Sequence, residues 1–330
     1  MNSNEDWYQT AIKKFKINEI LYKKFSGKPT RIGRGGFGLI YKTECNSIGT
    51  VAIKEITLGI EDDEICIKNF INELKIHSRT EHERILQFYG ISRNIDEGLY
   101  YLVLEYANQG NLREFLIKKK SCDNCFEWEE RVRLAVQIVE GLGYLHEVLN
   151  VAHRDLTNYV YRNLHSGNIL LQEDDLNHKL EIYVSDLDSC IYSDYKMRKE
   201  LYVYTSNIAP ENLRGEIISI KSDIYNLGVI MRELTLGNYY NINNPQCYHE
   251  LMQKCLDNDP ENRPNTLDLL EELHIFTASP LRKRQFEDAD SRGLQPLQIS
   301  PPLQKNKRLI NPSSEYFSNQ FSRGADYSFF

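Results

Sequence analysis

The hydrophobic positions between residues 30 and 107 fall in short runs that are separated by polar turns. Runs of this kind, rich in Ile, Val, Leu and Tyr, are typical of β-strands joined by hairpins. One longer segment differs, because Phe70, Ile71 and Leu74 recur at the spacing of a helix. The region is therefore predicted to form a small α+β lobe with strands at 31–35, 37–44, 50–56, 86–93 and 99–107 and one helix at 62–78.

After Tyr106 the apolar pattern becomes mainly helical. Val132, Ala135 and Val139 form one stripe of a core-facing helix over 129–146. This half of the chain is therefore predicted to be a mostly helical lobe. Its other predicted elements are a strand pair at 168–173 and 179–186 and helical segments at 222–236 and 246–275.

The two ends of the chain differ from the region between them. Trp7, Ala11 and Phe15 lie at helical spacing, so the first residues are predicted to form a helix that packs on the domain that follows. Near the other end the periodicity is lost and Ser, Pro, Gln and Arg become frequent, which is typical of disorder. The predicted organisation is a helical extension at 1–28, a domain at 29–277 with lobes at 29–106 and 107–277, and a disordered tail at 278–330.

Composition narrows the class of protein. The 330 residues are 41% hydrophobic and 26% charged, as in ordinary globular proteins. The net charge of −7 argues against a nucleic-acid partner, because binding to phosphate backbones needs clustered positive charge. No apolar run approaches the roughly 18 residues needed to span a bilayer, so no membrane partner is expected. Seven scattered cysteines suit a reducing compartment, and we expect a cytoplasmic protein, with the basic run 281–284 as a signal for a nuclear alternative.

A glycine-rich run, Gly33 to Gly38, has the spacing G-x-G-x-x-G. In dinucleotide-binding folds such a run leads into a helix, whereas here the following residues continue as a predicted strand. Glycines allow backbone N–H groups to approach phosphate oxygens closely. Lys54, in the run Val-Ala-Ile-Lys, would bring a positive charge to the same phosphates, and Glu73 on the predicted helix is the carboxylate expected to hold it.

With these motifs, residues 30–275 resemble a eukaryotic protein kinase of the tyrosine-kinase-like branch. The further matches are His153-Arg154-Asp155-Leu156, Asn168, Ser185-Asp186-Leu187-Asp188, Ala209-Pro210-Glu211, the run 222–228 and Arg263. The resemblance implies a two-lobed fold that binds ATP and Mg²⁺ and phosphorylates a protein substrate. It also implies that Arg263 pairs with Glu211, and that Arg154 or Arg162 meets a phosphate on the segment 187–208.

The resemblance assigns the nucleotide and metal sites residue by residue. Leu104 takes the gatekeeper position, and backbone groups of Glu105 and Ala107 are expected to bind adenine. Asn168 and Asp186 offer the oxygen ligands that magnesium requires. The complete set expected around ATP is Ile32, Gly33, Gly35, Gly36, Phe37, Gly38, Ile40, Ala52, Lys54, Leu104, Glu105 and Ala107.

The catalytic loop can be read in two registers. The family places the catalytic base five positions before the metal-binding Asn, but Asp155 lies thirteen positions before Asn168. In the first register Asp155 is the base and residues 157–164 bulge outward. In the second, Asn163 takes the base position at the usual spacing, and 148–158 form an enlarged loop. Asp155 is the better chemical match and is taken as the base, with the second register left open.

The two registers lead to two functional hypotheses. With Asp155 as base, the protein is an ATP-dependent protein kinase, and the branch it resembles favours serine or threonine over tyrosine. With Asn163 at that position it is a weak or inactive pseudokinase that binds ATP and acts as a scaffold, since an amide cannot accept the substrate proton. Asp188, which replaces the glycine of the family motif, also points to the second hypothesis.

Overall fold

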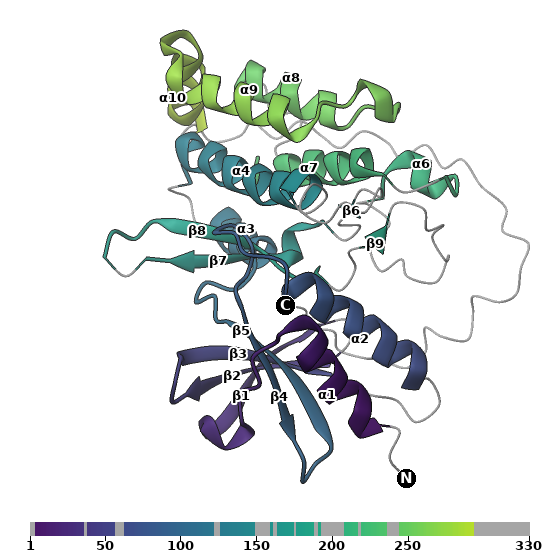
Figure 1. Cartoon of the computed structure of the whole chain (residues 1–330). Helices are drawn as coiled ribbons and strands as arrows, with labels where there is room; N and C mark the ends of the chain where they lie inside the picture. The colour runs from purple at the N-terminus through teal and green to yellow at the C-terminus, as the bar shows by residue number, and fades with distance from the viewer. Residues whose placement is uncertain are drawn as a thin grey trace, which may run out of the picture.

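The structure is a computed structural model. It describes residues 4–35, 38–56, 63–121, 126–148, 159–160, 164–174, 176–187, 191–192, 208–216, 219–235 and 244–293. Two lobes lie one above the other in Figure 1, with a sheet in the lower lobe and most of the helices in the upper one. The predicted two-lobed α+β architecture is therefore confirmed. None of the described helices has the length and apolar character needed to cross a lipid bilayer.

The lower lobe is built on a five-stranded antiparallel sheet with the order β1-β2-β3-β5-β4. In this register Lys54 of β3 lies between Ile40 of β2 and Leu102 of β5, so its side chain starts from the middle of the sheet. The five predicted strands and the predicted helix are all present. Their bounds are β1 Phe25–Gly35, β2 Gly38–Cys45, β3 Gly49–Ile56, α2 Asp63–His77, β4 Phe88–Asn94 and β5 Leu99–Glu105.

The helix predicted near the N-terminus is also present, as α1 (Asn4–Phe15). It lies beside α2 along the sheet (Figure 1) and its residues Tyr8 and Ala11 are buried. A short 3-10 turn, η1 (Tyr22–Lys24), then leads into β1.

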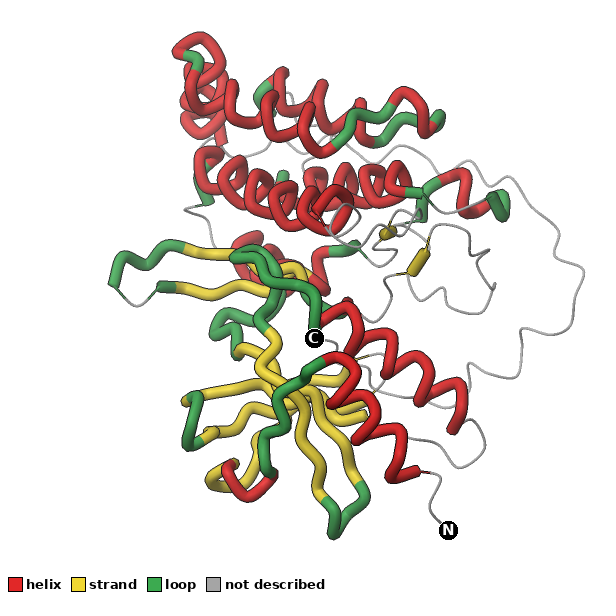
Figure 2. The backbone as a smooth tube through the Cα atoms, in the orientation of Figure 1, coloured by secondary structure: helices red, strands yellow, loops and turns green. Residues whose placement is uncertain are grey.

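The upper lobe is a helical bundle centred on α4 and α7, which Figure 2 shows as neighbouring red helices. The stripe predicted on α4, including Val132, Ala135 and Val139, is buried as expected. α7 is buried along most of its length, because its apolar residues Ile224, Leu227 and Ile230 pack in the same core. The helices of this lobe are α3 Leu112–Ser121, α4 Trp128–Gly143, η2 Tyr144–Val148, α6 Pro210–Leu213, α7 Ile220–Leu234, α8 Gln246–Cys255, η6 Pro260–Asn262, α9 Thr266–Ala278 and α10 Pro280–Gly293.

Two small two-stranded sheets accompany the helical bundle. The predicted pair is present as β7 (Ile169–Glu173) and β8 (Leu180–Val184). The turn η3 (Ser166–Asn168) precedes β7 directly. The second sheet pairs β6 (Tyr159–Val160) with β9 (Ile191–Tyr192), with Tyr159 opposite Tyr192.

Two predictions about the C-terminal part need correction. The segment 246–275 is two helices rather than one, since Pro260 and Pro264 lack the backbone N–H that helix interiors require. The disorder predicted from residue 278 is wrong for 280–293, which form α10. Phe286 of α10 packs against Trp128, with 5.9 Å between ring centroids, so tertiary burial stabilises a helix whose sequence is strongly polar.

Candidate active site

The glycine-rich run forms the turn between β1 and β2. Gly35 pairs with Gly38 at its tip, whereas Gly36 and Phe37 lie outside the described residues. Gly38 approaches the backbone of β3 so closely that a Cβ there would be 1.8 Å from the carbonyl oxygen of Glu55. A side chain at this position would therefore force the hairpin away from β3, and with it the backbone that covers the cleft.

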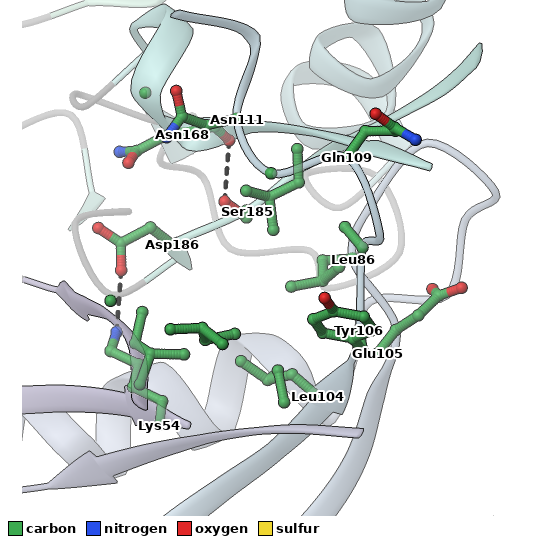
Figure 3. A pocket seen from close by; sticks show the side chains of 18 of the residues that line it. Lys54, Leu86, Leu104, Glu105, Tyr106, Gln109, Asn111, Asn168, Ser185 and Asp186 are labelled. Carbon is green, nitrogen blue, oxygen red and sulfur yellow. Dashed lines mark hydrogen bonds and ion pairs between the residues drawn. The ribbon is translucent and has the colours of Figure 1, made fainter. Parts of the chain in front are cut away.

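Lys54 joins three elements at the inner end of the cleft. Its Nζ lies 3.1 Å from Oε1 of Glu73 on α2. It also lies 2.8 Å from Oδ1 of Asp186, which follows β8, and Figure 3 marks this second contact with a dashed line. Burial alone would raise the pKa of Glu73, but the charge of Lys54 together with the hydrogen bond and charge of His77 outweighs it, and the pKa is lowered. The Glu73 carboxylate is therefore ionised beside the lysine, and the predicted ion pair between Lys54 and Glu73 is present.

Asp186 is held in place by its backbone. Its φ of +59° lies in the left-handed region, which is unusual for a residue with a side chain. The preceding Ser185 donates from its N–H and from its hydroxyl to the carbonyl oxygen of Asn168, each at 2.9 Å. The following Leu187 is fully buried and anchors the other side. These contacts bring Asn168 and Asp186, the two residues expected to bind metal, to the same side of the cleft.

The cleft has a volume of about 400 Å³, within the range of small-molecule sites. Figure 3 shows Leu86, Leu104 and Tyr106 on the side opposite Asp186, where an apolar ring would fit. The N–H of Glu105 donates to Gln87 O at 2.9 Å, which fixes the start of the segment between the lobes. The expected nucleotide residues that line this cleft are Ile32, Gly33, Ile40, Ala52, Lys54, Leu104, Glu105 and Ala107.

The described part of the catalytic loop begins at Leu164, which is buried. It continues through η3, where Asn168 N–H donates to His165 O at 2.9 Å. Strand β6 ends at Val160, so three residues separate it from Leu164. The expected catalytic residues Arg154, Asp155 and Asn163 lie outside the described residues, as do most of the candidate phosphorylation sites in 187–208.

A second ion pair joins Arg263 to Glu211 in the first turn of α6. Arg263 donates from its two terminal nitrogens to the two carboxylate oxygens of Glu211, at 2.7 and 2.8 Å. Both residues are buried, and the hydroxyl of Ser222 also donates to Glu211 at 2.9 Å. The predicted pair between Arg263 and Glu211 is therefore present.

A family model for protein tyrosine and serine/threonine kinases matches residues 28–249. The chain belongs to the protein kinase family. It is 30% identical over 238 residues to the receptor-like kinase LIP1 of Arabidopsis thaliana, a match that covers 69% of this chain and 35% of that protein. It is 29% identical over 218 residues to the PTI1-like tyrosine-protein kinase 2 of the same plant, covering 64% and 56%.

A third relative of this kinase is the LRR receptor-like serine/threonine-protein kinase GSO1 of Arabidopsis thaliana, 29% identical over 219 residues. That match covers 62% of this chain and 16% of GSO1. The kinase thus spans about a third of LIP1, a sixth of GSO1 and a little over half of the PTI1-like protein.

The sequence reasoning missed His77, which lines the cleft. Its Nε2 lies 3.8 Å from the Oε1 of Glu73, and its ring stacks on Phe88 with 4.9 Å between centroids. The signal was available, since His77 follows Glu73 by four positions on the predicted helix and such residues share a face. His77 therefore lies near the same carboxylate oxygen of Glu73 that Lys54 contacts.

Proposed function

We propose that this protein binds Mg²⁺–ATP in the cleft between its lobes and transfers the γ-phosphoryl group to a hydroxyl of a protein substrate. The observation that carries the proposal is the position of Lys54, whose Nζ is 3.1 Å from Glu73 and 2.8 Å from Asp186. A lysine held in this way presents a fixed positive charge where the α- and β-phosphates of ATP would lie. The apolar residues at the other side of the cleft suit the adenine ring.

Asn168 and Asp186 fit a magnesium site. Magnesium is usually held by one or two carboxylates together with substrate phosphates, so a dense cage of protein ligands is not needed. No cluster of three or more His, Cys, Asp or Glu side chains suited to a metal is found within the described residues. When bound, the metal would neutralise charge on the transferring phosphoryl group, while Lys54 orients the other phosphates.

The position of β6 favours Asn163 over Asp155 as the residue at the base position. With Asp155 as base, residues 157–164 would bulge outward, yet Tyr159 and Val160 pair with β9. Only residues 161–163 separate this strand from the buried Leu164, so the second register needs no bulge between β6 and the described part of the loop. We therefore propose that phosphoryl transfer is slow, because a positioned base supplies a factor of about 10² to 10⁴ in rate.

The same observation favours a second candidate function. A protein kinase without a base can serve as a nucleotide-binding scaffold that signals through contacts with other proteins. Binding of Mg²⁺–ATP is expected in both cases, because Lys54, Glu73 and Asp186 keep the same roles whichever residue takes the base position. The two candidate functions therefore differ in phosphoryl transfer but share the binding of Mg²⁺–ATP.

Phosphorylation of a generic protein substrate by wild type, Asn163→Asp, Asp155→Asn and Lys54→Met separates these candidates. We expect slow transfer by the wild type, an increase of about 10²-fold or more in Asn163→Asp, and no change in Asp155→Asn. Lys54→Met is the inactive control. Loss of activity in Asp155→Asn would identify Asp155 as the base. Binding of ATP without phosphoryl transfer by any variant would support the scaffold function instead.

We propose serine and threonine as the acceptor residues. The loop reads Leu164-His165-Ser166-Gly167-Asn168, which differs from the signatures of both serine/threonine and tyrosine kinases. The choice of acceptor residue therefore rests on the branch of the family that the sequence resembles. The names of the relatives differ on this point, since GSO1 is a serine/threonine kinase and the PTI1-like protein a tyrosine kinase. Phosphoamino-acid analysis of substrate labelled by Asn163→Asp would decide, and phosphotyrosine alone would overturn the proposal.

We further propose that the protein acts in signalling within the cytoplasm. The described cysteines Cys45, Cys247 and Cys255 are buried free thiols, which fits a reducing compartment. Imaging of a fluorescent fusion tests this, and exclusive nuclear signal would instead support the basic run 281–284 as a targeting segment.

A further inference from the structure

The segment that follows α1 is fastened to the edge of the sheet. Ile91 N–H of β4 donates to Asn18 O at 3.0 Å, and Ile20 N–H donates back to Ile91 O at 2.8 Å. Gly90 lies so close beneath this segment that a Cβ there would be 2.1 Å from Asn18 O. The helix α1 therefore extends from a fixed point on β4.

The other end of α1 contacts α2 through an aromatic pair. The Trp7 ring meets the Phe70 ring edge to face, with centroids 5.7 Å apart and an interplanar angle of 81°. Trp7 also contacts Tyr100 of β5 at 5.1 Å, and Tyr8, which is fully buried, contacts the same ring at 5.4 Å. Edge-to-face contacts at this distance are attractive and directional. The helix α1 thus bridges α2 and the sheet.

Phe70 links this contact to the candidate active site. It precedes Glu73 by three positions on α2, and residues at this spacing are neighbours on a helix surface. Phe70 and Leu74, on either side of Glu73, belong to one hydrophobic cluster with Tyr8 and Ala11 of α1. A change in where Phe70 lies therefore moves Glu73 relative to Lys54.

We propose that α1 is a built-in brace for α2, and that Trp7 is a positioning residue that holds Glu73 against Lys54 through Phe70. Residues 4–15 precede the region 28–249 that the family model matches, so the brace is supplied by the extension of this chain. Detachment of α1 would free α2 and weaken nucleotide binding. This inference rests on the proposed function in one respect, because the site that α1 would regulate is the proposed nucleotide site.

The first test measures binding of Mg²⁺–ADP to the full chain by calorimetry. Trp7→Ala is expected to weaken binding by about twofold to tenfold, the range that an aromatic pair supplies. Trp7→Phe keeps a ring at the contact and should retain affinity within about twofold. Lys13→Ala, on the exposed side of the same helix, is the matched control and should bind as wild type. Equal losses in Trp7→Ala and Lys13→Ala would overturn the proposal.

A double-mutant cycle separates positioning from general stability. Glu73→Gln removes the charge through which Trp7 is proposed to act, so adding Trp7→Ala to it should cause no further loss of affinity. An undiminished effect of Trp7→Ala in the Glu73→Gln background would show that Trp7 acts elsewhere, and would refute the brace.

Hydrogen exchange of α2 without nucleotide gives an independent readout. Amides of Asp63–His77 should exchange faster in Trp7→Ala than in Trp7→Phe, while those of α4 remain unchanged. Unchanged exchange across α2 would refute the brace. A wild-type protein that fails to bind Mg²⁺–ADP would refute the proposed function instead, and the exchange of α2 would still decide the proposal about α1.

Discussion

Arg263 and Glu211 form a bidentate ion pair, with N–O distances of 2.7 and 2.8 Å, although 52 positions separate them in the chain. Both side chains are buried. Burial alone would raise the pKa of Glu211, but the hydrogen bonds and charge of Arg263 outweigh it and the pKa is lowered. The pair fastens the start of α6 to the turn η6 and to α7, whose Lys221 carbonyl also accepts from Arg263 at 2.8 Å.

Removing one member of this pair leaves a buried charge without its partner. We expect Arg263→Met to lower the free energy of unfolding by about 3–5 kcal/mol, as for other broken buried pairs. Denaturant unfolding of the full chain measures the change. The matched control is Arg214→Met, which breaks a solvent-exposed pair with Glu216 and should leave the stability close to that of the wild type. Equal effects of the two substitutions would contradict the assignment of Arg263 as a structural anchor.

Lys54→Met removes the cation shared by Glu73 and Asp186. Lys54 then no longer offsets the charges of the two carboxylates, and the pKa of Glu73 should rise because burial is no longer opposed by the charge of Lys54. We expect affinity for Mg²⁺–ATP to fall by about tenfold or more, as measured by calorimetry. Lys28→Met, at an exposed position of β1, is the control. Wild-type affinity in Lys54→Met would mean that the phosphates do not approach this lysine.

His165 should make stability depend on pH. Burial, and then the nearby charge of Arg113, lower its pKa to about 4. An unfolded histidine titrates near 6.5, so between about pH 6.5 and 4 the unfolded state binds more protons than the folded state. Stability should therefore fall as the pH falls through this window, by up to about 3 kcal/mol, and should level off below it.

The substitution His165→Gln should flatten this part of the stability profile, measured as the denaturant midpoint between pH 4 and 7. His274→Gln, at an exposed position of α9, should leave the profile unchanged. If His165→Gln keeps the full wild-type slope, another group is responsible for it.

Two glycines near the end of α4 should respond to alanine in opposite directions. A Cβ at Gly141 would lie 3.0 Å from both Arg84 O and the side chain of Val184, whereas a Cβ at Gly143 would meet Thr266 at an ordinary 3.5 Å. We expect Gly141→Ala to destabilise the fold by about 1–3 kcal/mol through overpacking. Gly143→Ala should stabilise it by about 0.5–1 kcal/mol because alanine loses less backbone entropy. Thermal unfolding of both variants checks the signs, and a shared sign would contradict the packing seen around α4.

Much of the fold could be predicted because local patterns and tertiary structure agree. The strands carrying Ile53 and Val103 alternate with clear turns, and the stripe on α4 matches its buried face. The Lys54–Glu73 pair could be predicted for a different reason, because the protein kinase motifs indicate that Glu73 of α2 faces Lys54 of β3. Helix α10 could not be predicted, because its sequence is polar and its helix is stabilised by contacts of Phe286 and Asp290 with Trp128 of α4.

The candidate site could likewise be predicted only in part from the sequence. Its charged residues were visible as separate motifs, but the left-handed backbone of Asp186 and the two bonds from Ser185 to Asn168 depend on β7 and β8 being paired. His77 was missed because a histidine on a helix face carries no motif of its own. Strand β6 is too short to leave a periodic signal, and its partner strand, Ile191–Tyr192, is known only from the tertiary pairing.

The contact between α10 and α4 has a practical consequence for anyone moving this kinase domain into another protein. Asp290 accepts from the N–H of Trp128 at 3.1 Å, so it caps the first turn of α4, while Phe286 covers the indole ring. A chimaera joined at the family boundaries, 28 and 249, would expose Trp128 to water and leave the start of α4 uncapped. A transplanted domain should therefore extend at least through Asp290.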